Sequence, residues 1–151
     1  MKLIGSEEWC AFEQLNIPAI RARVDSGART SSIQAKEIKL IKKNGEDWVS
    51  FTVCPLQKNT KVQVQCSAKV LGRRSIKGSF GISEDRLIIK TPITIGKDTF
   101  DVELSLANRN TMEFRMLLGR EAMTNRFIIN PAVKHLQKKY LRKEVTALYK
   151  S

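Results

Sequence analysis

The sequence has little of the chemistry on which zinc enzymes depend. It contains a single histidine, His135, and three cysteines that form no Cys-x-x-Cys pair. Zinc sites in proteins are built from several Cys, His or acidic ligands at characteristic spacings. The sequence therefore gives no support to a zinc site, and we expect no metal and no cofactor. Cys66 lies on the apolar side of an alternating run and is predicted to be a buried thiol.

Long hydrophobic runs are also absent. No segment approaches the roughly 20 apolar residues of a membrane-spanning helix, and residues 1–8 lack the apolar core of a signal peptide. We therefore expect a cytoplasmic protein that does not enter a membrane. A chain of 151 residues, of which 42% are hydrophobic, fits one folded domain with its own core rather than a disordered chain.

Acidic residues are few in comparison with basic ones. The chain has 15 Asp and Glu against 27 Lys and Arg, so its formal net charge is +12. This excess implies an acidic partner, a nucleic acid, an anionic surface or only a soluble basic protein. Aromatic residues make up 7% of the chain and are not interleaved with the basic ones. Because unpaired bases stack on such aromatics, a nucleic acid is the least favoured partner.

Short stretches of alternating apolar and polar residues dominate the chain. Residues 61–70 alternate without a fault, and residues 100–106 alternate in the same way. Asn44-Gly45 is the strongest hairpin signal, and Pro92 within an apolar run suggests an edge or a bulge. Many short strands separated by turns predict an all-β, mainly antiparallel, closed or nearly closed barrel with one or two short helices.

The C-terminal residues differ from the rest of the chain. Asn130-Pro131 has the residues that start a helix, because Asn can cap it and Pro suits its first turn. Residues 132–151 then place apolar side chains at loosely helical spacing among lysines and arginines. We expect a domain over residues 1–131, followed by a basic C-terminal helix or tail over residues 132–151. This tail would pack on the barrel or a partner subunit, or serve as a basic arm for an anionic ligand.

One short motif near the N-terminus places a carboxylate in a tight turn. Residues 24–32 read Val-Asp-Ser-Gly-Ala-Arg-Thr-Ser-Ser, directly after an alternating run that predicts a strand. Gly27 allows a positive φ angle or a close backbone approach, and Ser26 can hydrogen-bond within the turn. The same residue types are common in ordinary turns. Asp25 therefore points to a function only in combination with a second motif.

That second motif lies far downstream. Residues 116–123 read Met-Leu-Leu-Gly-Arg-Glu-Ala-Met. An Asp-Ser-Gly turn followed later by two apolar residues and Gly-Arg resembles the pattern of retropepsin-like aspartic peptidases. Over residues 2–131 the chain more closely resembles a bacterial branch long labelled "ATP-dependent zinc proteases", which is related to a protein often encoded beside a ribosomal-protein glutamate ligase. The zinc in that label conflicts with the residues present.

The resemblance implies an aspartic peptidase that hydrolyses peptide bonds. Such enzymes use two carboxylates that share a proton, so that one activates a water while the other protonates the carbonyl oxygen. This chain has one Asp-Ser-Gly sequence, so the pair requires a homodimer with Asp25 from each subunit. Ser26 and Gly27 would fix the turn. The association with a glutamate-ligase system suggests acidic or glutamate-extended peptides, or an acidic protein, as the substrate.

The resemblance also implies a hairpin that covers the substrate. The matching region is residues 73–81, whose glycines would suit a mobile tip. An ordinary polar hairpin loop is an equal alternative, because the glycine content fits both. The hairpin residues expected to contact the substrate are Arg74, Ser75, Ile76, Lys77 and Gly78.

Arg29 is a departure from viral retropepsins, which carry an acid soon after the active turn, paired with the arginine of Gly-Arg. In this chain Gly119-Arg120 is followed by Glu121. We therefore expect Arg29, Arg120 and Glu121 to form a structural brace beside the turn, with a bidentate ion pair between Arg29 and Glu121. The alternative is that Arg29 points into the cleft and binds an acidic substrate.

Three functions fit these observations to different degrees. A dimeric aspartic peptidase is the best supported. The second is a binding module that keeps the same fold, performs no hydrolysis and holds an anionic peptide or protein, since a fold does not guarantee an activity. The third is a small barrel that binds nucleic acid.

Overall fold

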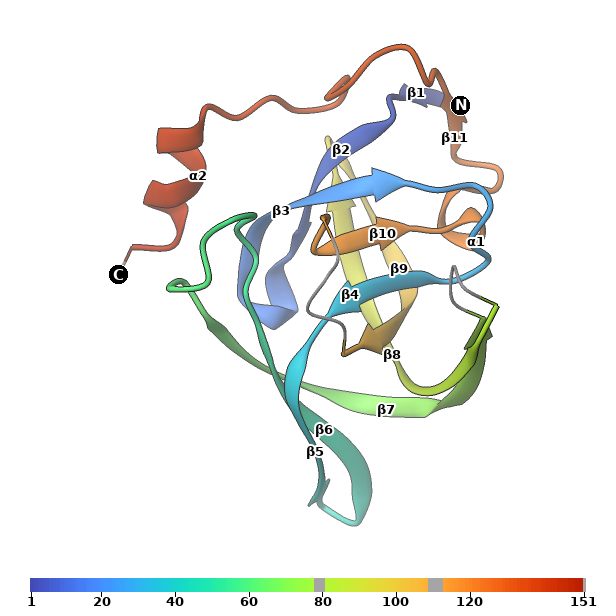
Figure 1. Cartoon of the computed structure of the whole chain (residues 1–151), viewed down its shortest axis with the longest axis vertical. Coiled ribbons are helices and arrows are strands. Elements are labelled where there is room, and N and C mark those ends of the chain that lie inside the picture. Colours follow the sequence, from blue (N-terminus) through green and yellow to red (C-terminus); the bar gives the residue numbers. More distant parts are fainter. Residues whose placement is uncertain (78–80, 109–112, 151) are drawn as a thin grey trace.

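The computed structural model describes residues 1–77, 81–108 and 113–150. Strands dominate it, and the two α-helices are short (Figure 1). Among the described residues, no helix has both the length and the apolar character needed to cross a membrane. The elements are β1 (Lys2–Ile4), β2 (Glu7–Phe12), a 3-10 turn (Glu13–Leu15), β3 (Ile17–Val24), β4 (Ser31–Gln34), β5 (Lys36–Lys43), β6 (Glu46–Val53), β7 (Val64–Lys77), β8 (Ser83–Ile95), β9 (Asp98–Ala107), β10 (Met116–Leu118), α1 (Arg120–Met123), β11 (Phe127–Ile129) and α2 (Arg142–Leu148).

Six strands close into a barrel. Their order is β2-β3-β10-β4-β9-β8, and the pairing of Ala11 with Thr94 joins β2 back to β8. Alternating side chains from these strands fill the interior, among them Phe12, Ile20 and Leu104, which are fully buried. The expected all-β barrel with short helices is thereby confirmed.

The sheet continues beyond the barrel through β7, β6 and β5. The hairpin of β5 and β6 projects away from the barrel, at the bottom of Figure 1. Its turn is Asn44-Gly45, as expected, and both residues have positive φ angles, 52° and 80°. Two such residues suit the twist of the flanking strands, which is why Asn-Gly is a strong hairpin signal.

Two strand predictions need refinement. The strand expected from residue 61 begins at Val64, where pairing with Val53 of β6 starts. Pro92 lies inside the long strand β8, paired along its length with β9. On the other side of β8, pairing with β7 ends at Ile89 and pairing with β2 occurs at Thr94. Pro92 therefore occupies a local edge, where a missing N–H does not interrupt a ladder.

The helix expected in the C-terminal segment does not start at Asn130-Pro131, and this part of the prediction is wrong; the helix there is α2, from Arg142 to Leu148. Residues 130–141, here called the strap, instead cross the N-terminal strands at the top of Figure 1 and lead to α2. Asn130 does accept a hydrogen bond from the N–H of Ala132, at 3.1 Å. His135 then adopts a left-handed φ of 54° and donates its N–H to the carbonyl of Glu7. Hydrogen bonds to the barrel thus replace those of a helix.

A buried carboxylate holds the strap in place. Glu8 has no solvent exposure, and its side chain accepts the N–H groups of Gly5, Leu136 and Gln137 at 2.7, 2.9 and 3.1 Å. Further along, Tyr149 hydrogen-bonds through its hydroxyl to the backbone of Ala19 in β3. The C-terminal segment therefore packs on the barrel, while the domain boundary expected at residue 131 stays a prediction.

Candidate active site

The Asp25 turn is built from two distant parts of the chain. It joins β3 to β4, and β10 lies between these two strands. Leu118 of β10 is paired with Val24 in parallel register, while Met116 is paired with Ile33 of β4 in antiparallel register. The two motifs singled out in the sequence are thereby side by side, with the residues after β10 beside the residues after β3.

Backbone hydrogen bonds fix the turn against the end of β10. The N–H of Asp25 donates to the carbonyl of Leu118 at 2.9 Å, and the N–H of Arg120 donates to the carbonyl of Ala28 at 2.7 Å. The N–H of Gly119 donates to Oγ of Ser31 at 2.9 Å. Since these bonds lie at both ends of the turn, its backbone has little freedom to move relative to the barrel.

The carboxylate of Asp25 lies at the mouth of this turn. Its Oδ1 accepts the N–H of Gly27 at 3.0 Å, and Oδ2 accepts no hydrogen bond from the part of the chain that the structure describes. Asp25 itself is partly exposed. One oxygen thus orients the carboxylate while the other is open to a second group, such as a water or another carboxylate.

Ser26 and Gly27 shape the turn through their backbones. The carbonyl of Ser26 accepts a hydrogen bond from Nη1 of Arg120 at 2.8 Å. A Cβ on Gly27 would lie 3.2 Å from Oδ1 of Asp25, and the φ angle of Gly27 is not positive. Of the two roles expected for this glycine, close backbone approach is the one observed, because a side chain here would crowd the carboxylate.

The expected ion pair between Arg29 and Glu121 is present, but it is not bidentate. Nε of Arg29 lies 2.6 Å from Oε1 of Glu121, and among the described residues this is the one hydrogen bond that joins the two side chains. The side chains are 73% and 45% exposed. Because solvent screens such a pair, it contributes at most about 1 kcal/mol to stability. Arg120, through Ser26, makes the more direct contact with the active turn.

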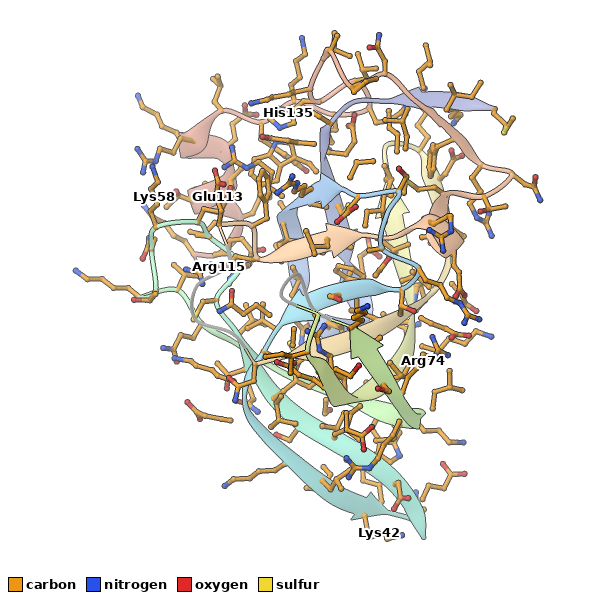
Figure 2. All side chains as sticks on the ribbon, turned by 45° about the vertical axis from the view of Figure 1, so that its right-hand side comes forward. Lys42, Lys58, Arg74, Glu113, Arg115 and His135 are labelled. Atoms are coloured by element: carbon orange, nitrogen blue, oxygen red, sulfur yellow. The ribbon has the colours of Figure 1, made fainter. Side chains whose placement is uncertain are left out.

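Four of the five hairpin residues expected to bind substrate, Arg74 to Lys77, lie on β7. Arg74, labelled in Figure 2, donates from Nη2 to Glu103 at 2.6 Å and from Nη1 to Oγ1 of Thr30 at 3.2 Å. The three residues from Ser75 to Lys77 continue the ladder with β8. Gly78 lies outside the described residues. The structure thus joins Arg74 to the end of the Asp25 turn, and the contact of these residues with substrate stays a prediction.

Sequence reasoning missed three polar residues beside Arg74. Arg86 of β8 is only 7% exposed, and its Nη1 donates to Oγ of Ser32 at 3.3 Å and to Oγ of Ser105 at 3.4 Å. The two serine hydroxyls are 2.8 Å apart. A signal was present in the unbroken run of hydroxyl residues from Thr30 to Ser32, which is unusual for a strand that enters a barrel core.

The thiols and the imidazole lie away from this chemistry. Burial raises the pKa of the Cys10 thiol and raises that of Cys66 to about 12, so neither supplies a thiolate at neutral pH. The prediction that Cys66 is buried is confirmed. His135 lies in the strap, at the top of Figure 2, with Nε2 3.2 Å from Oε2 of Glu7. Asp25 is therefore the acidic group that the turn itself carries.

Replacing Gly119 by alanine tests how tightly the turn is held. A Cβ at this position would lie 2.7 Å from the carbonyl carbon of Thr30 and 2.8 Å from the nitrogen of Ser31, both backbone atoms. The turn must therefore move, and we expect Gly119→Ala to lose about 1–3 kcal/mol of unfolding free energy in urea titration. Gly72→Ala is the control, since nothing lies within 4 Å of its Cβ. Equal midpoints for both variants would contradict this packing.

Comparison with known proteins gives a family and several relatives. A family model described as "Retropepsin-like aspartic endopeptidase RimB" matches residues 3–140, which extends past residue 131, where the resemblance was expected to end. A "Probable alpha-L-glutamate ligase" of Desulfotalea psychrophila is 55% identical over 132 residues, covering 87% of this chain and 28% of the relative. A protein of the same name from Parasynechococcus marenigrum is 40% identical over 147 residues, covering 97% of this chain and 32% of the relative. The chain thus spans about a third or less of these relatives.

A solved structure supports the fold. The crystal structure of a Legionella pneumophila protein of unknown function aligns with a TM-score of 0.75 and 23% identity, over 91% of this chain and 98% of that chain. This likeness concerns the fold alone. Together with the family match over most of the chain, it agrees with the turn and barrel described above. The chain belongs to the RimB-like family of retropepsin-like aspartic endopeptidases.

Proposed function

We propose that this protein is an aspartic peptidase in which two copies of the chain each contribute Asp25. The observation that carries the proposal is the Asp25 turn, which hydrogen bonds fix to the end of β10 while one carboxylate oxygen stays open. A single chain supplies one such carboxylate. A homodimer with a two-fold axis beside the turn supplies the pair that the chemistry requires.

The two carboxylates have complementary roles in this proposal. At a separation of about 4 Å in a partly screened environment, two negative charges repel each other by about 4 kcal/mol, so one carboxyl keeps its proton. The ionised carboxylate takes a proton from a bound water as the water oxygen attacks the peptide carbonyl carbon. The protonated carboxyl donates its proton to the carbonyl oxygen, which gives a tetrahedral diol. The diol returns one hydroxyl proton to a carboxylate as its C–N bond breaks, and the proton taken from the water passes to the leaving amine. The pair titrates as one unit, so its two pKa values belong to the dimer.

The substrates we propose are acidic peptides or an acidic protein, including peptides extended by glutamate. Two observations support this: the net charge of +12 and the relatives named as glutamate ligases, in which a matching segment forms part of a longer chain. A positively charged protein attracts an acidic substrate and raises its local concentration. We further propose that the protein works with a glutamate-ligase system in the cytoplasm.

The solution mass tests the dimer. We expect multi-angle light scattering to give a mass near twice the 17.1 kDa of one chain. The Asp25→Asn variant is expected to keep this mass, because the change removes a charge at the turn and no apolar surface. A monomer at every concentration, with and without an acidic peptide, would contradict the paired-carboxylate mechanism and favour a non-catalytic binding module of the same fold.

A further inference from the structure

Five polar side chains from four strands meet Thr30 at the end of the Asp25 turn. The register pairs Ser32 of β4 with Ser105 of β9, and Arg74 of β7 with Arg86 of β8. Because paired residues share one face of a sheet, these side chains lie on one side of it. We call this group the arginine face; its members are Thr30, Ser32, Arg74, Arg86, Glu103 and Ser105.

Arg86 is the most buried cation of the arginine face. It is 7% exposed, yet its Nη1 is held by two neutral serine hydroxyls at 3.3 and 3.4 Å, near the long limit for a hydrogen bond. Its Nε donates to Glu84 at 3.1 Å, a side chain that is 40% exposed. Nη2 bonds to no described residue and is not among the fully buried unpaired atoms, so it retains contact with solvent.

The arginine face has one donor left for an additional anion. Arg74 and Arg86 are directly opposite each other; Arg74 uses the carboxylate of Glu103 at 2.6 Å, and Arg86 uses its Nε for Glu84 at 3.1 Å. Nη2 of Arg86 is therefore available to an acceptor that enters from solvent, beside two serine hydroxyls. A carboxylate is the best-fitting partner, because the planar guanidinium can donate to both of its oxygens. Ser32 and Ser105 can turn their hydroxyls to donate to the same group.

The arginine face lies close to the candidate active site. Thr30 ends the turn that begins at Asp25, Ser32 lies in the strand β4 that follows it, and Ser31 between them accepts the N–H of Gly119. One strand, β10, lies between Ser32 and the end of β3, so at about 4.8 Å per strand spacing Ser32 lies roughly 10 Å from the strand end that leads into Asp25. An extended peptide bound at Asp25 spans that distance with about three residues on one side of its scissile bond.

We propose that the arginine face binds a carboxylate side chain of the substrate, with Arg86 as the residue that selects it. This inference rests on the proposed function in one respect, since it takes the substrate to lie beside Asp25. It differs from the sequence-based expectation, which assigned acidic recognition to Arg29 and to hairpin residues. Arg29 is largely exposed and paired with Glu121, whereas Arg86 is recessed, where water screens a charge less.

Peptide binding by a catalytically silent protein tests the proposal. The Asp25→Asn variant is titrated, by calorimetry, with an acetylated hexapeptide of alternating glutamate and alanine and with its glutamine counterpart. The two peptides have the same shape and differ in charge. We expect the glutamate peptide to bind at least about 10-fold more tightly, because a guanidinium–carboxylate bond is replaced by a weaker neutral one. No preference for glutamate would overturn the proposal.

Two further variants in the same background locate the preference. Arg86→Met is expected to reduce the glutamate-to-glutamine affinity ratio to within about 3-fold of unity, because the charge that selects the carboxylate is gone. Arg73→Met is the matched control: it removes one arginine from the adjacent position of β7, where the side chain is exposed and lies on the opposite face. We expect this control to keep the glutamate-to-glutamine affinity ratio of the Asp25→Asn protein. Equal ratios in the two variants would overturn the assignment to Arg86.

A second variant tests the same site in case Arg86→Met does not fold. Ser105→Ala removes one hydroxyl and no charge, and we expect it to lower the ratio about 3-fold while the circular dichroism spectrum stays unchanged. An unaltered ratio in folded Ser105→Ala would count against the site. Hydrolysis is assayed separately on the parent chain. If the protein prefers the glutamate peptide but hydrolyses nothing, the peptidase proposal is refuted and the binding role of the arginine face stands. If it hydrolyses peptides without a preference for glutamate, the binding role of the arginine face is refuted and the peptidase proposal stands.

Discussion

The Asp25→Asn protein is expected to lose peptidase activity by about 10³-fold, within the range for removal of a general acid–base group. An amide neither accepts a proton from water nor shares one with a second group. The change affects both members of the pair in a homodimer. The turn itself should persist, because Oδ1 of an asparagine can still accept the N–H of Gly27 that Asp25 accepts now.

The control for this result is the same chemical change at a site away from the turn. Asp47 lies on the projecting hairpin, is paired with Lys42 at 2.6 Å and is 61% exposed. The Asp47→Asn protein is therefore expected to cleave a peptide substrate at the parental rate. Cleavage of a glutamate-extended peptide is followed by mass spectrometry of the products. Equal rates for Asp25→Asn and the parent would end the aspartic-peptidase proposal.

The Glu8→Ala protein is expected to lose about 3 kcal/mol or more of unfolding free energy. Glu8 is fully buried and accepts three backbone N–H groups, two of them from the strap. Its removal leaves buried donors without partners, at about 1–3 kcal/mol for each group, reduced where water enters the gap. The unfolding free energy of Glu8→Gln should lie between those of the parent and Glu8→Ala, because one amide oxygen remains as an acceptor while the amide NH₂ faces donors.

Urea titration followed by circular dichroism measures this loss. Glu13→Ala is the matched control, since Glu13 is exposed and its side chain has no hydrogen bond or ion pair among the described residues. We expect its change in stability to stay within about 0.5 kcal/mol. Limited proteolysis should also cut Glu8→Ala within residues 130–141 sooner than the control. Matching midpoints for Glu8→Ala and Glu13→Ala would show that the carboxylate does not hold the strap.

The strap also shows where sequence patterns stop being informative about the fold. Alternation located most strands, and Asn44-Gly45 located a hairpin, because both signals act between near neighbours in the chain. Asn130-Pro131 is an equally local signal, and it predicted the start of a helix at a place where none forms. The hydrogen bonds from Leu136 and Gln137 to Glu8 connect residues far apart in the sequence, and such bonds can override local preference.

Part of the candidate site could likewise be predicted from the sequence, and part could not. Asp25 and the Gly-Arg motif could be recognised because each belongs to a short run of consecutive residues. The Arg29–Glu121 ion pair could then be predicted, because Arg29 and Glu121 lie next to these two motifs. The arginine face could not be foreseen, since it depends on Ser32 of β4 lying beside Ser105 of β9, with Arg86 of β8 reaching both. Alternation within one strand indicates which face a side chain occupies, but not which residue of a distant strand lies beside it.

The insertion of β10 between β3 and β4 has a consequence for the order of folding. The turn that carries Asp25 is translated early, but the strand that holds it is made of Met116 to Leu118. Until these residues leave the ribosome, β3 and β4 lack the neighbour that lies between them. Contacts of such sequence separation form late and slowly. A nascent chain would therefore have no assembled carboxylate turn, and the proposed hydrolysis would begin only after synthesis of the barrel is almost complete.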